Sequence, residues 1–94
     1  MYKMTATIIN PTGLHARPAS TFAKTAGKYK SKIMIARADH IDNAVNAKSM
    51  VMLLSLSAAQ GVSVCISAEG DDEQEAITAL VALIKSGFGE KGCL

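Results

Sequence analysis

The spacing of apolar residues changes period several times along this chain, and this change constrains the fold more than any other feature. Residues 2–9, 31–38 and 62–68 alternate between apolar and polar side chains, as strands with one buried face do. Residues 18–26 and 77–88 instead place apolar side chains three and four positions apart, the period of an amphipathic helix. No linker, repeat or low-complexity stretch separates these segments, so we expect them to share one core.

Two shorter segments complete the order of elements. Residues 44–46 are long enough only for a brief return strand, and residues 49–56 form a short, mostly apolar helix that ends before Gly61. The predicted order is β-α-β-β-α-β-α. Strands with one apolar and one polar face favour an antiparallel sheet that is covered on one side. We therefore expect an α+β open-faced sandwich, in which a four-stranded antiparallel sheet carries three helices on one face.

The composition supports one small core and no second domain. Of the 94 residues, 49% are hydrophobic but only 4% are aromatic, so the core must consist mainly of aliphatic side chains and methionine. A chain of this size buries enough surface on folding for a single domain. We expect residues 1–94 to form that domain, with a flexible tail from about residue 89.

Two connections carry local signals. Residues 37–43 are polar and are predicted to form a turn. The start of the final helix predicts an N-cap with a capping box, formed by Asp71 with Gln74 or by Asp72 with Glu75.

Charge and cysteine content exclude several classes of protein. The net charge of +2 comes without a basic run, which argues against a nucleic-acid surface. The longest apolar run, residues 50–54, is far shorter than the ~20 residues that span a bilayer. Cys65 and Cys93 suit neither a disulfide framework nor a zinc site, and neither His15 nor His40 has a second ligand at metal-binding spacing. We expect a cytoplasmic protein with reduced thiols, no membrane insertion, no metal and no cofactor.

The sequence concentrates chemistry in residues 13–19, Gly-Leu-His-Ala-Arg-Pro-Ala. An Asn-Pro-Thr-Gly turn ends the first strand just before, and Pro18 suits the first turn of a helix, so His15 and Ala16 lie at a helix N-terminus. The unpaired N–H groups there, around Ala16 and Arg17, favour an anion. Arg17 adds a permanently charged fork that matches phosphoryl oxygens.

His15 supplies a nucleophile to this anion site. An imidazole is largely neutral near pH 7, and the positive end of the helix favours the neutral form. A neutral ring nitrogen can accept a phosphoryl group, and the same helix end then stabilises the anionic product. The alternative is a polar residue at a helix cap, the commoner role of an isolated histidine. The Gly-x-His-x-Arg-Pro arrangement favours the functional interpretation.

This segment resembles the active-site signature of the HPr family, the phosphocarriers of the bacterial sugar phosphotransferase system. Residues 46–56, with Asn-Ala-Lys-Ser-Met-Val and then Leu-Leu-Ser-Leu, match a second segment of the family, and residues 66–73 match a third. The resemblance covers residues 3–90 in the right order and spacing.

The resemblance implies a cytoplasmic relay and not an enzyme with a turnover of its own. Enzyme I, charged by phosphoenolpyruvate, would phosphorylate His15 at Nδ1, and the group would then pass to a sugar-specific enzyme IIA component. Arg17 and the backbone N–H groups of Ala16 and Arg17 would stabilise the group without trapping it. The protein is expected to act as a monomer.

Ser49 matches the regulatory serine of the family, which HPr kinase/phosphorylase phosphorylates with ATP in many bacteria. Its other role is that of a helix N-cap, and the two are compatible. Three features depart from the family pattern: Met52 stands where a small or polar residue is common, Ser57 stands where glycine usually follows the helix, and residues 37–43 exceed the usual tight hairpin. These departures bear on recognition by the kinase more than on phosphotransfer.

The helix after Ser49 is too apolar for an ordinary surface helix. Leu53 and Leu56 are expected to pack on the sheet, although a deeper position of the helix would bury its other apolar residues too. An exposed apolar patch indicates a partner surface, and methionine suits one that fits several partners. The outward-facing residues of this docking patch are Met50, Val51 and Leu54.

Two other functions fit the same sequence. A nitrogen-branch or regulatory HPr paralogue would use its phosphate to modulate other proteins and not sugar uptake. A small binding module would hold a free anionic ligand at the helix end without being modified.

Overall fold

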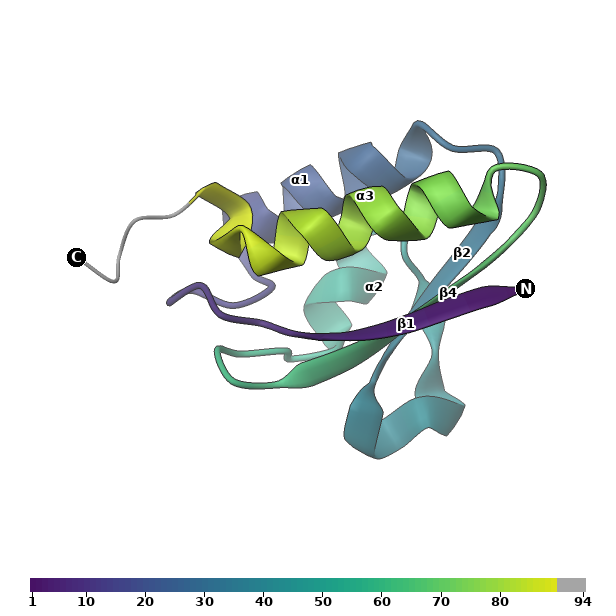
Figure 1. Ribbon diagram of the computed structural model, residues 1–94. Coiled ribbons are helices and arrows are strands. Elements are labelled where there is room, and N and C mark those ends of the chain that lie inside the picture. Colours follow the sequence, from purple (N-terminus) through teal and green to yellow (C-terminus); the bar gives the residue numbers. More distant parts are fainter. Residues whose placement is uncertain (90–94) are drawn as a thin grey trace.

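The computed structural model describes residues 1–89, in which three α-helices lie on one face of a sheet (Figure 1). The elements are β1 (Tyr2–Thr7), α1 (Ala16–Gly27), β2 (Lys32–Arg37), the 3₁₀ segment η1 (Ala38–Asn43), β3 (Val45–Asn46), α2 (Met50–Ser55), β4 (Ser63–Glu69), α3 (Glu73–Lys85) and the 3₁₀ segment η2 (Gly87–Gly89). The four strands are ordered β1-β4-β2-β3, and every pair is antiparallel. The predicted open-faced sandwich is therefore confirmed.

Strand β4 lies at the centre of the sheet and shows how the alternating pattern works. Its residues Val64 and Ile66 are buried against the helices, whereas Cys65 lies on the open face in register with Thr5 and Ala36. Cys65 is half-buried and is a free cysteine. Cys93 and most of the predicted tail lie outside the described residues.

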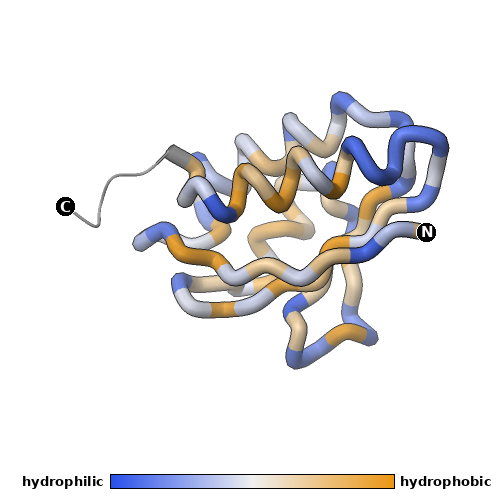
Figure 2. The backbone as a smooth tube through the Cα atoms, in the orientation of Figure 1, coloured by the Kyte–Doolittle hydropathy of each residue, from blue (hydrophilic) through white to orange (hydrophobic). Residues whose placement is uncertain are grey.

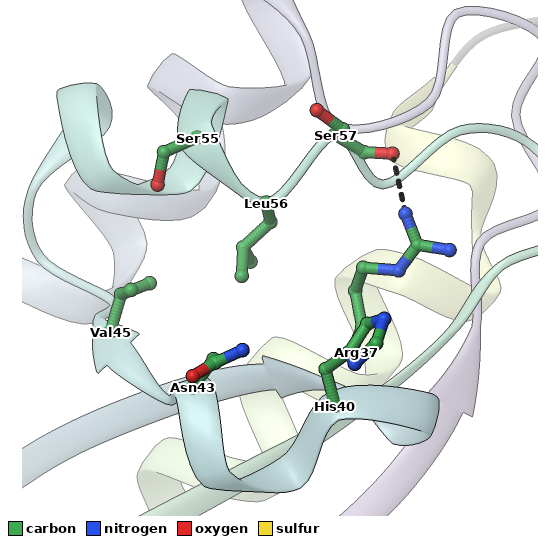
Figure 3. Close-up of a pocket in the computed structure, with 7 residues that line it drawn as sticks. All are labelled: Arg37, His40, Asn43, Val45, Ser55, Leu56 and Ser57. Carbon is green, nitrogen blue, oxygen red and sulfur yellow. Dashed lines mark hydrogen bonds between the residues drawn. The ribbon is translucent and has the colours of Figure 1, made fainter.

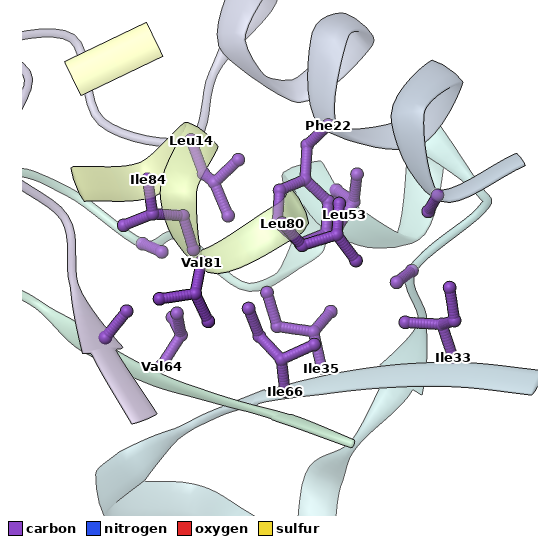
Figure 4. Packing of buried hydrophobic residues seen from close by; sticks show 14 of the residues in the cluster. Leu14, Phe22, Ile33, Ile35, Leu53, Val64, Ile66, Leu80, Val81 and Ile84 are labelled. Atoms are coloured by element: carbon purple, nitrogen blue, oxygen red, sulfur yellow. The ribbon is translucent and has the colours of Figure 1, made fainter. Parts of the chain in front are cut away.

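The core between sheet and helices is aliphatic around a single fully buried ring, that of Phe22 (Figure 4). Leu53 of α2 and Leu80 of α3 are completely buried beside it, and Ile35 and Ile66 rise to meet them from the sheet. Figure 2 shows hydrophobic residues along the middle of the strands and of α3, with hydrophilic residues at the turns. None of the helices within residues 1–89 is long and apolar enough to cross a membrane.

The structure refines one local prediction, at residues 37–43, and contradicts another, at the start of α3. The predicted turn at residues 37–43 is η1, a short 3₁₀ segment broken at His40, where φ is −141° and ψ is 55°. Figure 1 shows it projecting from the sheet, away from the helices. The extra length of this connection is thus folded and is not an open loop.

The predicted capping box at the start of α3 is wrong. Asp72 is the N-cap residue, but its side chain makes no hydrogen bond within the helix. Its carboxylate instead accepts hydrogen bonds from Lys30 N (2.8 Å), from Ser31 N (3.0 Å) and from the Ser31 hydroxyl. Two backbone donors and a hydroxyl on one carboxylate outweigh a single cap bond. The Ser31 hydroxyl is the main reason that the pKa of Asp72 lies below its ordinary value.

Candidate functional site

A tight turn over residues 10–13 leads the chain from β1 towards His15. Gly13 N donates to Asn10 O (3.1 Å), and Asn10 Nδ2 donates back to Gly13 O (2.9 Å) and to Thr12 Oγ1 (3.2 Å). Asn10 is only 2% exposed, so its side chain fills the inside of the turn. The turn is therefore fixed by both backbone and side-chain bonds.

The end of this turn is seated on the segment that follows α2. Gly13 has φ +67°, and a Cβ added there would lie 2.6 Å from Ala58 O and 2.8 Å from Ala59 Cα. Only glycine fits so close an approach in this conformation. The next residue, Leu14, donates its N–H to Ala58 O (2.7 Å) and buries its side chain completely. His15 therefore follows directly on two anchored residues.

His15 is the N-cap residue of α1, in an extended conformation with φ −129° and ψ 159°. Its side chain makes no capping hydrogen bond, and the residue is exposed. Pro18 and Ala19 are buried and fix the first turn of α1 to the core. The imidazole thus stands at a rigid helix start while remaining accessible to another molecule.

The electrostatic surroundings of His15 favour an anion. Arg17, the second residue of α1, is exposed, and the first turn of α1 contains no acidic residue. Among residues 1–89, no carboxylate lies within ion-pair distance of the Arg17 guanidinium. Ala16 is the first residue of α1, so its backbone N–H belongs to the N-terminal turn. The exposed His15 is therefore followed directly by the positive end of α1 and, two residues on, by an exposed arginine.

Ser49 begins the second helix and caps it as predicted. It is extended, with φ −104° and ψ 114°, and its hydroxyl accepts a hydrogen bond from Met52 N (3.4 Å). The first turn of α2 also lacks an acidic residue. Ser49 and His15 thus occupy the same position on two different helices.

The outer face of α2 is apolar and exposed, in the orientation expected from the sequence. Leu53 and Leu56 are buried, whereas the exposed fractions are 39% for Met50, 74% for Val51 and 38% for Leu54. Met52 belongs to the same surface at 40% exposed, although the sequence analysis treated it only as a departure from the family. Its exposure depends on how deeply the helix sits, which periodicity over six residues does not define.

Two residues that shape the site escaped the sequence analysis. Asn10 braces the turn, and the Asn-Pro-Thr-Gly composition could have indicated such a role, since asparagine side chains often bond their own turns. Ala58 accepts the Leu14 N–H, and no sequence signal points to it.

A pocket lies elsewhere, between η1 and the end of α2 (Figure 3). Its lining contains none of the predicted site residues; it consists of Arg37, His40, Asn43, Val45, Ser55, Leu56 and Ser57. His40 is exposed there, within the polar connection of residues 37–43. Within residues 1–89, no group of three or more His, Cys, Asp or Glu residues could hold a metal ion.

Comparison with known proteins gives a consistent result across sequence and structure. Residues 2–86 match the family model described as the PTS HPr component phosphorylation site. The chain is 41% identical over 90 residues to the phosphocarrier protein HPr of Neisseria meningitidis serogroup A, covering 96% of this chain and 98% of that protein. The crystal structure of HPr-C-His from Thermoanaerobacter tengcongensis matches with a TM-score of 0.90 and 52% identity, over 97% of this chain and 99% of that one. An HPr dimer from the same organism matches with a TM-score of 0.74 and 52% identity, over 96% and 100% of the two chains.

Proposed function

The chain belongs to the HPr family, the phosphocarriers of the phosphotransferase system, and from this premise we propose that His15 is the residue that carries the phosphoryl group. The observation behind this assignment is that His15 is exposed at the start of α1 and makes no capping hydrogen bond that its ring would have to break. A neutral ring nitrogen attacks the phosphorus of the donor, and an N–P bond forms as the bond to the donor's leaving group breaks. The reverse exchange discharges the carrier to its acceptor.

Arg17 and the first turn of α1 stabilise the phosphoryl group during both exchanges. The guanidinium offers two parallel N–H donors to phosphoryl oxygens, and the N–H groups of Ala16 and Arg17 lie at the positive end of the helix. Arg17 lies at the surface, where water weakens charge interactions. This arrangement favours transfer of the phosphoryl group to an acceptor over its retention on His15.

The partners we propose are enzyme I as donor and sugar-specific enzyme IIA components as acceptors. They would dock on the apolar face of α2, formed by Met50, Val51 and Leu54 together with the exposed Met52. The dimeric HPr of T. tengcongensis shows that a relative can pair with itself. For this chain we propose action as a monomer, because its own Ala58 anchors the two residues before His15.

Ser49 is the proposed regulatory site, phosphorylated by HPr kinase/phosphorylase. A phosphate on its hydroxyl would sit at the start of α2, where helix N–H groups tolerate an anion. The same charge would lie next to Met50 in the docking patch. We therefore expect phosphorylation of Ser49 to oppose docking without unfolding the helix.

The decisive test is incubation with phosphoenolpyruvate and enzyme I, followed by assay of acid-labile phosphate. A phosphocarrier gains one such group, and a module that merely binds an anion gains none. The His40→Ala variant is the matched control, since it removes an exposed histidine outside the site. Transfer onward to a sugar-specific enzyme IIA component supports the sugar branch; labelling without that transfer supports the regulatory paralogue.

A further inference from the structure

Ser57 adopts a backbone conformation that residues other than glycine rarely hold. Its φ is +54°, and it follows Leu56, the C-cap residue of α2. Helices often end in this left-handed conformation, but the residue is then usually glycine, because a Cβ makes it strained. A strained residue of this kind persists only where its surroundings hold it in place.

Arg37 at the end of β2 holds Ser57. Its Nη1 donates to Ser57 O (3.3 Å), as Figure 3 shows. The other side of the guanidinium is fixed by Asp39, with Nε to Oδ1 at 3.1 Å and Nη2 to Oδ2 at 3.3 Å. The pKa of Asp39 is lowered chiefly by this contact with Arg37, so the carboxylate is charged at neutral pH. One arginine thus links η1 to the end of α2.

Open space surrounds this link. One surface hollow lies between Arg37 and residues such as Asn43 and Leu56, and a second lies between Arg37 and Gly61. On the inner side, Ser57 N donates to Leu54 O (3.3 Å) and the Ala58 side chain is buried in the core. Between these two anchors, the Ser57 carbonyl accepts the hydrogen bond from Arg37.

The residue after Ser57, Ala58, anchors the loop of residues 10–15 that leads to His15, which we call the His15 loop. Ala58 O accepts the Leu14 N–H at 2.7 Å, and Gly13 is packed so closely against Ala58 that no Cβ fits. A rotation of the backbone at Ser57 would displace Ala58 O and with it the two residues before His15. A displacement of about 1 Å at a reacting group can reduce the rate up to about 100-fold.

We propose that Arg37 is a positioning residue for phosphotransfer, which holds Ser57 and so keeps Ala58 in place as the seat of the His15 loop. This inference rests on the proposed function, since it takes His15 to be the acceptor. Arg37 touches neither His15 nor the phosphoryl group in this arrangement. It acts only through the backbone of residues 57–58 and 13–14.

The test uses Arg37→Ala, Ser57→Gly and the double variant, with Lys32→Ala as an exposed control on the same strand. For Arg37→Ala we expect the saturating rate of His15 phosphorylation by enzyme I to fall about fivefold, with an unchanged KM, because the ring is misplaced while the docking patch is untouched. The double variant should recover to within about twofold of wild type, since glycine holds a positive φ without help. Ser57→Gly and Lys32→Ala should react like wild type. The amide NMR signals of Gly13 and Leu14 should shift in Arg37→Ala and return in the double variant.

Several results would overturn the inference. A raised KM at constant saturating rate would place Arg37 in the partner interface. A double variant as slow as Arg37→Ala would show that Arg37 does not act through Ser57. An unchanged phosphorylation rate in Arg37→Ala would show that Arg37 has no positioning role. If that variant does not fold, Arg37→Gln in the presence and absence of Ser57→Gly gives the same comparison. Failure of the proposed function looks different, because then wild type itself acquires no label on His15.

Discussion

The first turns of α1 and α2 differ in how their N-terminal donors are used. Both helices follow an extended N-cap residue, and neither has an acidic residue in its first turn. Ser49 turns its hydroxyl inward and accepts the Met52 N–H at 3.4 Å, whereas the His15 side chain makes no capping bond. The Ser49 side chain therefore satisfies one of the N-terminal donors of α2, whereas the His15 side chain satisfies none of those of α1.

The difference shows that a helix N-terminus alone does not define a phosphoryl site. A reacting residue must also be exposed and leave the helix uncapped, as the proposed acceptor His15 does. Asp72 at the start of α3 illustrates a third use, because its carboxylate holds the backbone of Lys30 and Ser31. The three helix starts thus differ in their first residue: the proposed acceptor His15 at α1, a capping hydroxyl at α2, and at α3 a carboxylate that links the helix to the segment before β2.

The largest expected effect is that of His15→Ala. This variant should lose all phosphoenolpyruvate-dependent labelling while its thermal unfolding midpoint stays at the wild-type value, because the lost side chain is exposed and makes no capping bond. The measurements are acid-labile phosphate and a circular-dichroism melt. Labelling that survives the substitution would show that the open end of α1 is not the reacting site.

Arg17→Lys should slow transfer to and from His15 by about tenfold, since a hydrogen bond to a charged group is worth about 1.5–3 kcal/mol and lysine cannot offer two parallel donors. Rapid-quench kinetics in both directions measure the effect. Transfer at the wild-type rate would reduce Arg17 to a solvated residue of the first turn.

Ser49→Asp should raise the KM for enzyme I several-fold and leave the saturating rate close to normal. The added charge must lose water when a partner covers the adjacent Met50, and an unpaired buried charge is unfavourable. At the helix start the same carboxylate should leave the free energy of unfolding unchanged or raise it by ~0.3–1 kcal/mol. Steady-state kinetics separate this effect from damage to His15, for which the saturating rate would fall instead.

Ser49→Ala tests the capping side of the comparison. Loss of the hydroxyl leaves Met52 N without its acceptor and should reduce the free energy of unfolding by about 0.5–1 kcal/mol. His15 labelling should proceed at the wild-type rate. Urea denaturation of Ser49→Ala and of His15→Ala then compares the two helix starts directly. Equal free energies of unfolding for the two variants would contradict a capping role for Ser49.

The smallest effect concerns pH and the start of α3. Hydrogen bonds, chiefly from the Ser31 hydroxyl, lower the pKa of Asp72 in the folded protein. The folded state therefore binds this proton less readily than the unfolded state, and the contribution of Asp72 to stability is present above the ordinary carboxyl pKa of about 4. It is lost as pH falls through the lower folded value. Asp72→Asn should flatten the decline of the unfolding midpoint below about pH 4, and an unchanged acid profile would refute the assignment.

Sequence patterns by themselves determined the element order, the buried faces of the three longer strands and of the first and last helices, and the position of His15 at a helix start. These features follow from periods of two and 3.6 residues and from proline and glycine signals, all of which act between near neighbours. The burial of Leu53 and the exposure of Val51 followed from the same reasoning.

Only the tertiary structure decided which groups meet across the fold. The Asp72 carboxylate finds Ser31, 41 positions away, and thereby abandons the local capping box. Arg37 reaches Ser57, 20 positions away, and Leu14 is seated on Ala58. Such pairings depend on how the sheet and helices pack, because a polar side chain takes the best set of partners that the packed chain brings within reach. A sequence pattern does not state which residues far apart along the chain lie close together in the folded protein.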